Sequence, residues 1–356
     1  MSAVETWIDA AIGETRQVLV RDGAPVMLHV ARWSDAGKRA LWGEAYVARV
    51  RTVDRRRRGC FVDLGLGDEH GFLRLDAQGR VKGRALAEGQ GVVVRVTREA
   101  VRGKAAVLEL LAEPAPEGAP RRLQRPECDS DLEAATPSEI EARERIDDIV
   151  DASLAHIAPI PGGGLLTIEP TAALVAIDVD SGRRSGSPDA EKFALDLNIA
   201  AAQAVARELR LRNLGGIVAI DFVSMRDRRG GEAVVAALKA AVADDPWGVT
   251  VAAMSRFGVV EMSRGQLRAP LAERFLDADG RPSAETVALK ALRAMEREAR
   301  GARGREVVAR LAPDVIAWLE ADVIGWREAL RSRIGPRWRL LAEPAGARER
   351  IDVEAV

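Results

Sequence analysis

The sequence predicts an α+β protein of several domains, and three observations support this prediction. Two short apolar runs, Leu174–Val179 and Ile217–Phe222, flank a long amphipathic stretch, which predicts a strand–helix–strand unit with parallel neighbouring strands. Between about Gly43 and Leu111, short strand patterns alternate with turn residues, as in a small β-barrel. A chain of 356 residues with 47% hydrophobic residues can form two or three small domains.

The composition excludes several classes of protein. Charged residues make up 30% of the chain but the net charge is −1, so any affinity for RNA must come from local arginine clusters. The acidic N-terminus does not resemble a signal peptide, and no apolar run approaches the length that spans a membrane. Two cysteines, Cys60 and Cys128, imply no disulfide framework, and the three histidines form no zinc-binding spacing with them. We therefore expect a cytoplasmic protein without a membrane segment.

The first part of the chain is predicted to be β-structure. Thr15–Trp33 has the pattern of two short strands joined by a turn at Asp22-Gly23. The five short strands between Gly43 and Leu111 suggest an OB-fold barrel. Alternation along two of these strands leaves Phe61 and Phe72 on the polar face, where single-stranded RNA stacks on aromatic rings. The alternative is that a loop covers the two rings or that one ring packs at a domain boundary.

Two helices are predicted around the apolar runs. The first begins at a capping box, Thr136–Glu139, after a linker at residues 113–135 that is rich in Pro, Glu, Ala and Arg. The second begins at Ser187, with Pro188 at the first helical position. Both carry apolar side chains at four-residue spacing: Ile146, Val150 and Leu154 in the first, and Phe193, Leu197, Ala201, Val205 and Leu209 in the second.

Aspartates end both apolar runs. Asp178 and Asp180 share one face of the first strand, and Asp221 ends the second strand. Since the carboxyl ends of parallel strands meet at one edge of a sheet, the three carboxylates converge and repel each other unless a cation lies among them. This arrangement suits a Mg²⁺ site for chemistry at a phosphate. The alternative is that these aspartates cap turns or pair with Arg183 and Arg184.

The C-terminal half continues the α+β pattern. Two strand patterns lie on either side of Arg256–Gly258, and Arg256 and Arg264 are candidates for contacts with a phosphate, surface salt bridges being the alternative. Residues 283–300 predict a helix rich in Ala, Arg and Glu. The remainder predicts strand, helix and strand, with Trp318 and Trp326 in that helix as core or interface residues.

Several blocks resemble the catalytic core of the ribonuclease E/G family. AIDVDSGR, LNIAAAQAVARELRLRNLGGIVAIDF and SRFGVVEMSR lie in the expected order between about Leu165 and Pro270. The resemblance implies a Mg²⁺-dependent endoribonuclease, active also with Mn²⁺, that cleaves single-stranded RNA and leaves a 5′-phosphate. It places the metal ligands at Asp178 and Asp221. Asp180 stands where the family has a supporting asparagine, so a charge is added and an amide donor is lost.

The resemblance also implies a domain organisation and RNA contacts. It implies a DNase I-like core, an RNase H-like subdomain that is not catalytic, an S1 domain inserted in that subdomain, and a small C-terminal αβ domain. Phe61 and Phe72 match aromatic positions of the S1 domain, and Lys104 matches a lysine near the 5′ end of RNA. The expected boundaries are 1–36 for the opening hairpin, 37–111 for the S1 domain, 112–165 for the rest of the RNase H-like subdomain, 166–282 for the core and 283–356 for the C-terminal domain.

The sequence departs from the family in two further places. The interval between S1 domain and core is too short for the family's 5′-sensor segment, and its arginines, Arg121, Arg122 and Arg125, lie in the predicted linker. No cysteine occurs in Leu271–Pro282, where the family has a CPxCxG zinc link, so we expect no zinc and a monomer or weak homodimer. Two rival functions remain open: an RNA-binding homologue that uses the S1 domain without cleaving, and a structural or assembly protein.

Overall fold

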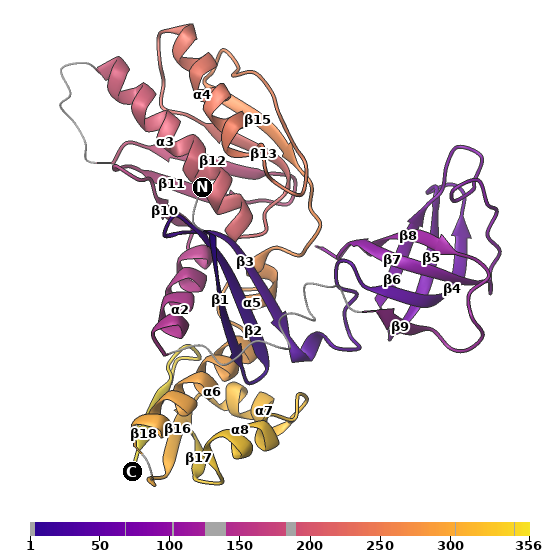
Figure 1. Ribbon diagram of the computed structural model, residues 1–356, viewed down its shortest axis with the longest axis vertical. Helices are drawn as coiled ribbons and strands as arrows, with labels where there is room; N and C mark the ends of the chain where they lie inside the picture. The colour runs from indigo at the N-terminus through magenta and orange to yellow at the C-terminus, as the bar shows by residue number, and fades with distance from the viewer. Residues whose placement is uncertain are drawn as a thin grey trace.

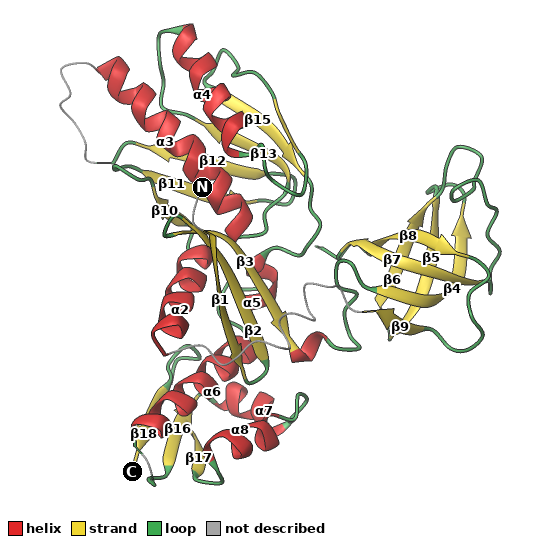
Figure 2. Cartoon of the chain, viewed as in Figure 1, coloured by secondary structure: helices red, strands yellow, loops and turns green. Residues whose placement is uncertain are grey.

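The computed structural model describes residues 4–67, 69–101, 103–124, 140–182, 190–302, 304–344 and 346–356. The predicted helix starts at Thr136–Glu139 and Ser187 lie outside these residues, as do Cys128, Arg125 and the arginine pair Arg183 and Arg184. The described residues form four sheets with helices packed on three of them (Figure 1, Figure 2), which confirms the mixed α+β class. The barrel lies to one side of an elongated body made of the other three sheets.

The N-terminal sheet is an antiparallel meander of β1 (Val4–Ala11), β2 (Glu14–Arg21) and β3 (Ala24–Arg32), followed by a 3-10 turn, η1 (Trp33–Asp35). The predicted turn is confirmed: Asp22 and Gly23 have φ values of 51° and 78°, the left-handed pair that a tight hairpin needs. Helix α2 (Ile140–Leu154) covers this sheet, with Ile146 and Val150 in its core. Strand β1 was not predicted, because its first half is exposed and lacks a clear alternation.

A network of buried charges joins this sheet to α2 and to the C-terminal part of the chain. Arg143 Nε donates to Asp9 at 2.9 Å, and its Nη1 donates to Glu296, also at 2.9 Å. Glu14 accepts from Arg32 Nε at 2.8 Å and from Arg293 Nη1 at 3.0 Å. The side chains of these residues are almost fully buried. Because each buried charge has an opposite partner, the network holds three distant segments in one arrangement.

The second sheet closes into a five-stranded barrel, in agreement with the OB-like prediction. The order is β5-β6-β8-β7-β4, and pairing of β4 with β5 closes it. Its core contains Cys60, Val62 and Leu64 from one strand and Leu73 from the next, as alternation predicted. The strands are β4 (Ala45–Asp54), β5 (Gly59–Leu66), β6 (Glu69–Arg74), β7 (Gly91–Arg98) and β8 (Ala106–Ala112).

Part of the predicted linker is ordered on the barrel. Residues Arg121–Gln124 form β9, which pairs with β4 at the edge of the sheet. Arg122 Nη1 lies 2.8 Å from the buried carboxylate of Glu44. The linker prediction is therefore wrong for these residues, because a short strand without an apolar period gains its stability from pairing with an existing sheet.

The third sheet has six strands in the order β10-β11-β12-β13-β15-β14. Strands β12 and β13 are parallel, as predicted, and are joined by α3. Helices α3 and α4 lie side by side over one face of the sheet (Figure 1), where Ile177 and Val218 are buried in the core. The elements are β10 (Ile157–Pro159), β11 (Leu165–Pro170), β12 (Val175–Asp180), α3 (Ala190–Leu211), β13 (Gly216–Asp221), α4 (Arg228–Ala241), β14 (Val249–Val251) and β15 (Val259–Arg264).

The C-terminal part has a sheet of order β17-β16-β18 with α6 packed against it. The predicted single helix between strands is two helices, and Gly325, at φ 67°, separates them, so Trp318 and Trp326 lie on different helices. Trp326 is fully buried and donates from Nε1 to the carbonyl of Leu319 at 2.8 Å. No helix in the described ranges is both long and apolar enough to cross a membrane. The elements are α5 (Leu271–Phe275), α6 (Ala284–Gly301), β16 (Val307–Leu311), α7 (Pro313–Glu320), α8 (Trp326–Ile334), β17 (Trp338–Ala342) and β18 (Asp352–Ala355).

Candidate functional site

Two aspartates stand side by side at the carboxyl ends of parallel strands. Asp178 of β12 is the direct register partner of Asp221 of β13. Both side chains are exposed, whereas their neighbours Ile177 and Ile220 are buried under the helices. Alternation along each strand therefore turns the two carboxylates to the face of the sheet that α3 and α4 leave open. Asp180 lies on the same face, two residues beyond Asp178.

The electrostatics of this edge favour a cation. Partial desolvation raises the pKa of Asp178, and the negative charges of Asp221 and then Asp180 raise it further. No basic side chain of the described chain lowers it. Neighbouring carboxylates disfavour each other's ionisation unless a positive charge lies between them.

The two carboxylates suit Mg²⁺ better than a metal enclosed by protein ligands. In the described ranges, no group of three or more His, Cys, Asp or Glu side chains is arranged to hold a metal ion. Mg²⁺ is usually bound by one or two carboxylates, with waters and substrate phosphate completing its shell. The donor set of Asp178 and Asp221 therefore fits Mg²⁺ or Mn²⁺, with the rest of the coordination left to water and substrate.

Asp180 also has a local structural role. Its Oδ1 accepts a hydrogen bond from the backbone N–H of Gly182 at 2.8 Å, which closes the turn after β12. The turn-capping alternative is thus correct for one oxygen of this residue.

A buried asparagine fixes the loop that follows Asp221. The Asn198 side chain on α3 donates from Nδ2 to the carbonyl of Val223 at 2.8 Å and accepts from the N–H of Val223 at 3.0 Å. Glu191, in the first turn of α3, accepts from the N–H groups of Arg226 and Asp227 at 2.7 and 2.9 Å. Sequence reasoning missed Asn198, although a polar residue beside the apolar stripe of a buried helix was a usable signal.

Arg256 lies in a turn at the same end of the sheet as the acid pair, whereas Arg264 lies at the opposite end of β15. The turn that carries Arg256 leads directly into β15, whose first residue, Val259, is the register partner of Asp221. The Arg256 side chain is exposed, and its guanidinium carbon lies 4.7 Å from the centroid of the Phe257 ring. This position keeps Arg256 as a candidate phosphate contact.

The prediction for Arg264 is wrong. Its side chain is buried, with Nε 2.8 Å from Asp245 Oδ2 and Nη1 donating to the Leu214 carbonyl at 2.6 Å. Its guanidinium also stacks over Trp247 at 4.1 Å. Burial lowers the pKa of Arg264 although Asp245 opposes this. Alternation along β15 places Arg264 on the covered face, so it holds the core together and contacts neither phosphate nor solvent.

The aromatic pair of the barrel is arranged as alternation predicted. Phe61 and Phe72 are direct cross-strand partners on the outer face, half-buried, with ring centroids 5.5 Å apart and planes at 64°. The Phe72 ring lies directly over Gly59, where a Cβ would approach it to 1.9 Å. Lys104 is exposed in the turn between β7 and β8. These three residues lie on the barrel, apart from the sheet that carries Asp178 and Asp221 (Figure 1).

Comparison with known proteins identifies one family. The family model described as the Ribonuclease E/G family matches residues 77–267, more than half of the chain. Ribonuclease E of Escherichia coli is 36% identical over 162 residues, which are 44% of this chain and 15% of that protein. Ribonuclease G of Escherichia coli is 35% identical over 149 residues, 40% of this chain and 29% of that protein. The chloroplastic Ribonuclease E/G-like protein of Arabidopsis thaliana is 39% identical over 125 residues, 35% of this chain and 12% of that protein. The chain thus spans less than a third of the length of each of these relatives.

Proposed function

The chain belongs to the ribonuclease E/G family, and on this premise we propose that it is an endoribonuclease that cleaves single-stranded RNA in RNA processing or decay. The observation that carries the proposal is the register pairing of Asp178 with Asp221 on an open sheet face. The printed names of the relatives, ribonuclease E and ribonuclease G, agree with it.

In this proposal Asp178 and Asp221 hold one Mg²⁺, or Mn²⁺ in its place. An ion held there would supply charge stabilisation at the scissile phosphate and a more acidic water for in-line attack, the chemistry that would leave a 5′-phosphate. Asn198 keeps the end of β13 and the following loop in one position, so that Asp221 points to the open face. Arg256 offers a cation to a neighbouring phosphate.

The domain roles of the family complete the proposal. We assign a DNase I-like core to residues 166–282, an RNase H-like subdomain to the N-terminal sheet with α2, and an S1 domain to the barrel, whose Phe61, Phe72 and Lys104 contact RNA. The region of the family's zinc link contains α5 and no cysteine, so the proposal includes no zinc and a monomer or weak homodimer. A cytoplasmic location belongs to the same proposal.

A second candidate is an RNA-binding protein that does not cleave. It is favoured by Asp180, which replaces the family's asparagine and adds a negative charge beside Asp178. A single experiment separates the two candidates. A labelled single-stranded RNA is incubated with the whole chain over a titration of Mg²⁺ or Mn²⁺, and binding is measured in parallel in a chelator.

Metal-dependent cleavage by the wild type, lost in Asp178→Ala and kept in a matched control, Asp279→Asn, supports the nuclease. Asp279 is a suitable control because it lies in an exposed turn, where its side chain forms a surface ion pair with Arg281. Binding without cleavage at any metal concentration supports the second candidate and refutes the first. Absence of both supports a structural or assembly role.

A further inference from the structure

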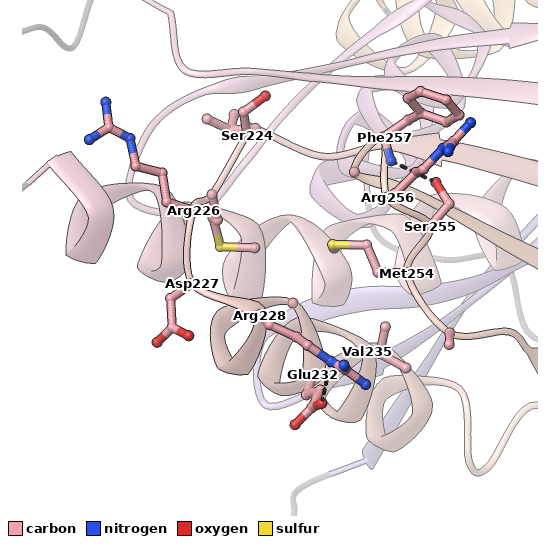
Figure 3. A pocket seen from close by; sticks show the side chains of 15 residues that line it. Ser224, Arg226, Asp227, Arg228, Glu232, Val235, Met254, Ser255, Arg256 and Phe257 are labelled. Carbon is pink, nitrogen blue, oxygen red and sulfur yellow. Dashed lines mark hydrogen bonds and ion pairs between the residues drawn. The ribbon is translucent and has the colours of Figure 1, made fainter.

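A cavity of about 700 Å³ lies among the loops at the end of the sheet where β12 and β13 carry the acid pair, on the side of α4; Figure 3 shows its lining. Three segments line it: the loop after β13 (223–228), the first turns of α4, and the turn between β14 and β15 (253–258). The cavity begins two residues beyond Asp221, and its far wall continues into Val259, the register partner of Asp221. A ligand in this cavity therefore lies at the same end of the sheet as Asp178 and Asp221, so an RNA strand passing around that end reaches both.

The floor of the cavity is made of two methionines resting on a glycine pair of α4. A Cβ at Gly230 would lie 3.2 Å from the sulfur of Met225, and a Cβ at Gly231 would lie 3.0 Å from the sulfur of Met254. Glycine in a helix costs about 1 kcal/mol relative to alanine, so these two glycines destabilise α4 while giving the thioethers room. Methionine sulfur is polarisable and packs well against flat aromatic groups.

One wall is an exposed aromatic ring. The Phe257 side chain is 72% exposed, which is unusual for so large an apolar group. The guanidinium of Arg256 covers part of this ring, while Ser255 Oγ accepts from the Phe257 N–H at 3.3 Å and shapes the turn (Figure 3). An exposed ring held beside a cation is the arrangement on which unpaired bases stack.

The rim carries a small excess of positive charge. The lining contains three arginines, Arg226, Arg228 and Arg256, and two acids, Asp227 and Glu232. Both acids already have partners, since Asp227 accepts from the N–H of Arg229 at the start of α4 and Glu232 Oε1 lies 3.4 Å from Arg228 Nε. Figure 3 shows Met254 between the Arg228–Glu232 pair and the Phe257 turn. The cavity thus combines an apolar, polarisable interior with a cationic edge, which matches a base joined to a phosphodiester.

We propose that this cavity is a nucleobase subsite that takes the base of an RNA nucleotide within two positions of the cleaved bond. The base stacks on Phe257 above the methionine floor, and its phosphate faces Arg256. This inference rests on the proposed nuclease function, and it adds that one nucleotide near the cut is selected by stacking. Because every base has a flat face, stacking tolerates all four bases, so the subsite excludes none of them at that position.

The first test measures binding without cleavage. Single-stranded RNAs carrying 2-aminopurine at successive positions are mixed with the whole chain in a chelator, and fluorescence quenching and affinity are recorded. In Phe257→Ala, quenching at one position is lost and binding weakens by roughly 10-fold, the effect of one stacked base. Phe257→Trp keeps both the quenching and the affinity because it keeps an aromatic ring, whereas Phe257→Leu loses both. The matched control is Val323→Ala, which removes a similarly exposed apolar side chain far from the cavity in sequence.

The second test measures cleavage. RNAs with a single abasic nucleotide at each position around the cut are cleaved by the wild type and by Phe257→Ala. The wild-type rate falls by roughly 10-fold for one abasic position, and Phe257→Ala shows no such position. Cleavage by the wild type without any sensitive position refutes the subsite and leaves the nuclease intact. Position-specific quenching that depends on Phe257, in a chain that never cleaves, refutes the nuclease and leaves the subsite. Equal quenching in wild type and Phe257→Ala overturns the inference.

Discussion

The side chain of Asn198 pairs with the backbone of Val223 through two hydrogen bonds, of 2.8 and 3.0 Å, in the way that one strand pairs with the next. Asn198 is fully buried, so both polar groups of Val223 lose their only partners in the described chain when the amide is removed. The strand end that carries Asp221 is then free to shift.

We therefore expect Asn198→Ala to reduce both stability and cleavage. Leaving the half-buried N–H and carbonyl of Val223 unpaired costs at most about 1–3 kcal/mol, which a denaturant titration measures. Single-turnover cleavage should fall by roughly 10-fold or more. RNA affinity should fall by no more than roughly 10-fold, the share of the cavity that Val223 lines, because the barrel is untouched. Gln203→Ala, at an exposed position of the same helix, is the control. Equal effects of the two substitutions would show that Asn198 does not position the site.

Substitution of either paired aspartate should separate activity from stability. Asp178→Asn or Asp221→Asn should abolish cleavage while RNA binding persists. The pKa of Asp178 is raised in the folded state, so the folded protein binds this proton more tightly than the unfolded chain does. Asp178 therefore stabilises the fold at low pH, and this stability is lost as the pH rises through the folded pKa. At neutral pH the ionised carboxylate opposes folding. Without divalent ions Asp178→Asn should thus melt at least as high as the wild type. Added Mg²⁺ should stabilise only the wild type. Near wild-type cleavage by either variant would remove the metal assignment.

Asp180→Asn should keep or raise activity. The asparagine oxygen can still accept from the Gly182 N–H, so the turn after β12 remains closed. One negative charge beside Asp178 disappears, and changes in groups that support a metal ligand alter activity on the order of 10–100-fold. The rate of cleavage at saturating Mg²⁺ is the measurement. An inactive Asp180→Asn enzyme would mean that Asp180 binds the metal directly.

Phe61→Ala and Phe72→Ala should weaken RNA binding without unfolding the barrel. Each stacked base contributes about 1–3 kcal/mol, so the dissociation constant should rise by roughly 5- to 150-fold. Fluorescence anisotropy with a short single-stranded RNA measures this change, and thermal melting is the control. A large fall in melting temperature with unchanged affinity would assign the two rings to the core.

The buried charge network should make the protein sensitive to acid. Burial alone would raise the pKa of Glu14, but the charges of Arg32, Arg293 and Arg16 lower it to about 2. A depressed pKa contributes stability that is complete above the unfolded value near 4.5 and is lost as pH falls from there toward 2. Glu14→Gln should cost on the order of 3 kcal/mol at neutral pH, because buried arginines lose a partner, and should flatten stability in that range. Unfolding titrations at several pH values test both statements; a parallel pH dependence in the variant would contradict them.

The sequence predicted what depends on local periodicity. Alternation alone placed Asp178, Asp221, Phe61 and Phe72 on the correct faces, since period two is a property of every strand. The phosphate contact expected for Arg264 rested on its residue type, and it is wrong because the sequence does not say which face of β15 is covered. Strands β1 and β9 were missed because pairing with a neighbour, rather than their own side chains, defines them. Asn198 was missed since its role depends on a backbone segment 25 residues away.

The ion pair between Glu14 and Arg293 joins residues 279 positions apart. A ribosome synthesises the first long before the second, whereas the barrel between them closes with partners that lie within residues 45–112. A nascent chain that has not yet reached Arg293 therefore contains a complete barrel beside N-terminal strands in which Glu14 has Arg32 as a partner but still lacks Arg293. Domains that close by local contacts form first, and long-range closure is slow. We therefore expect the barrel to fold before the buried ion pairs of the N-terminal strands are complete, although those strands are made first.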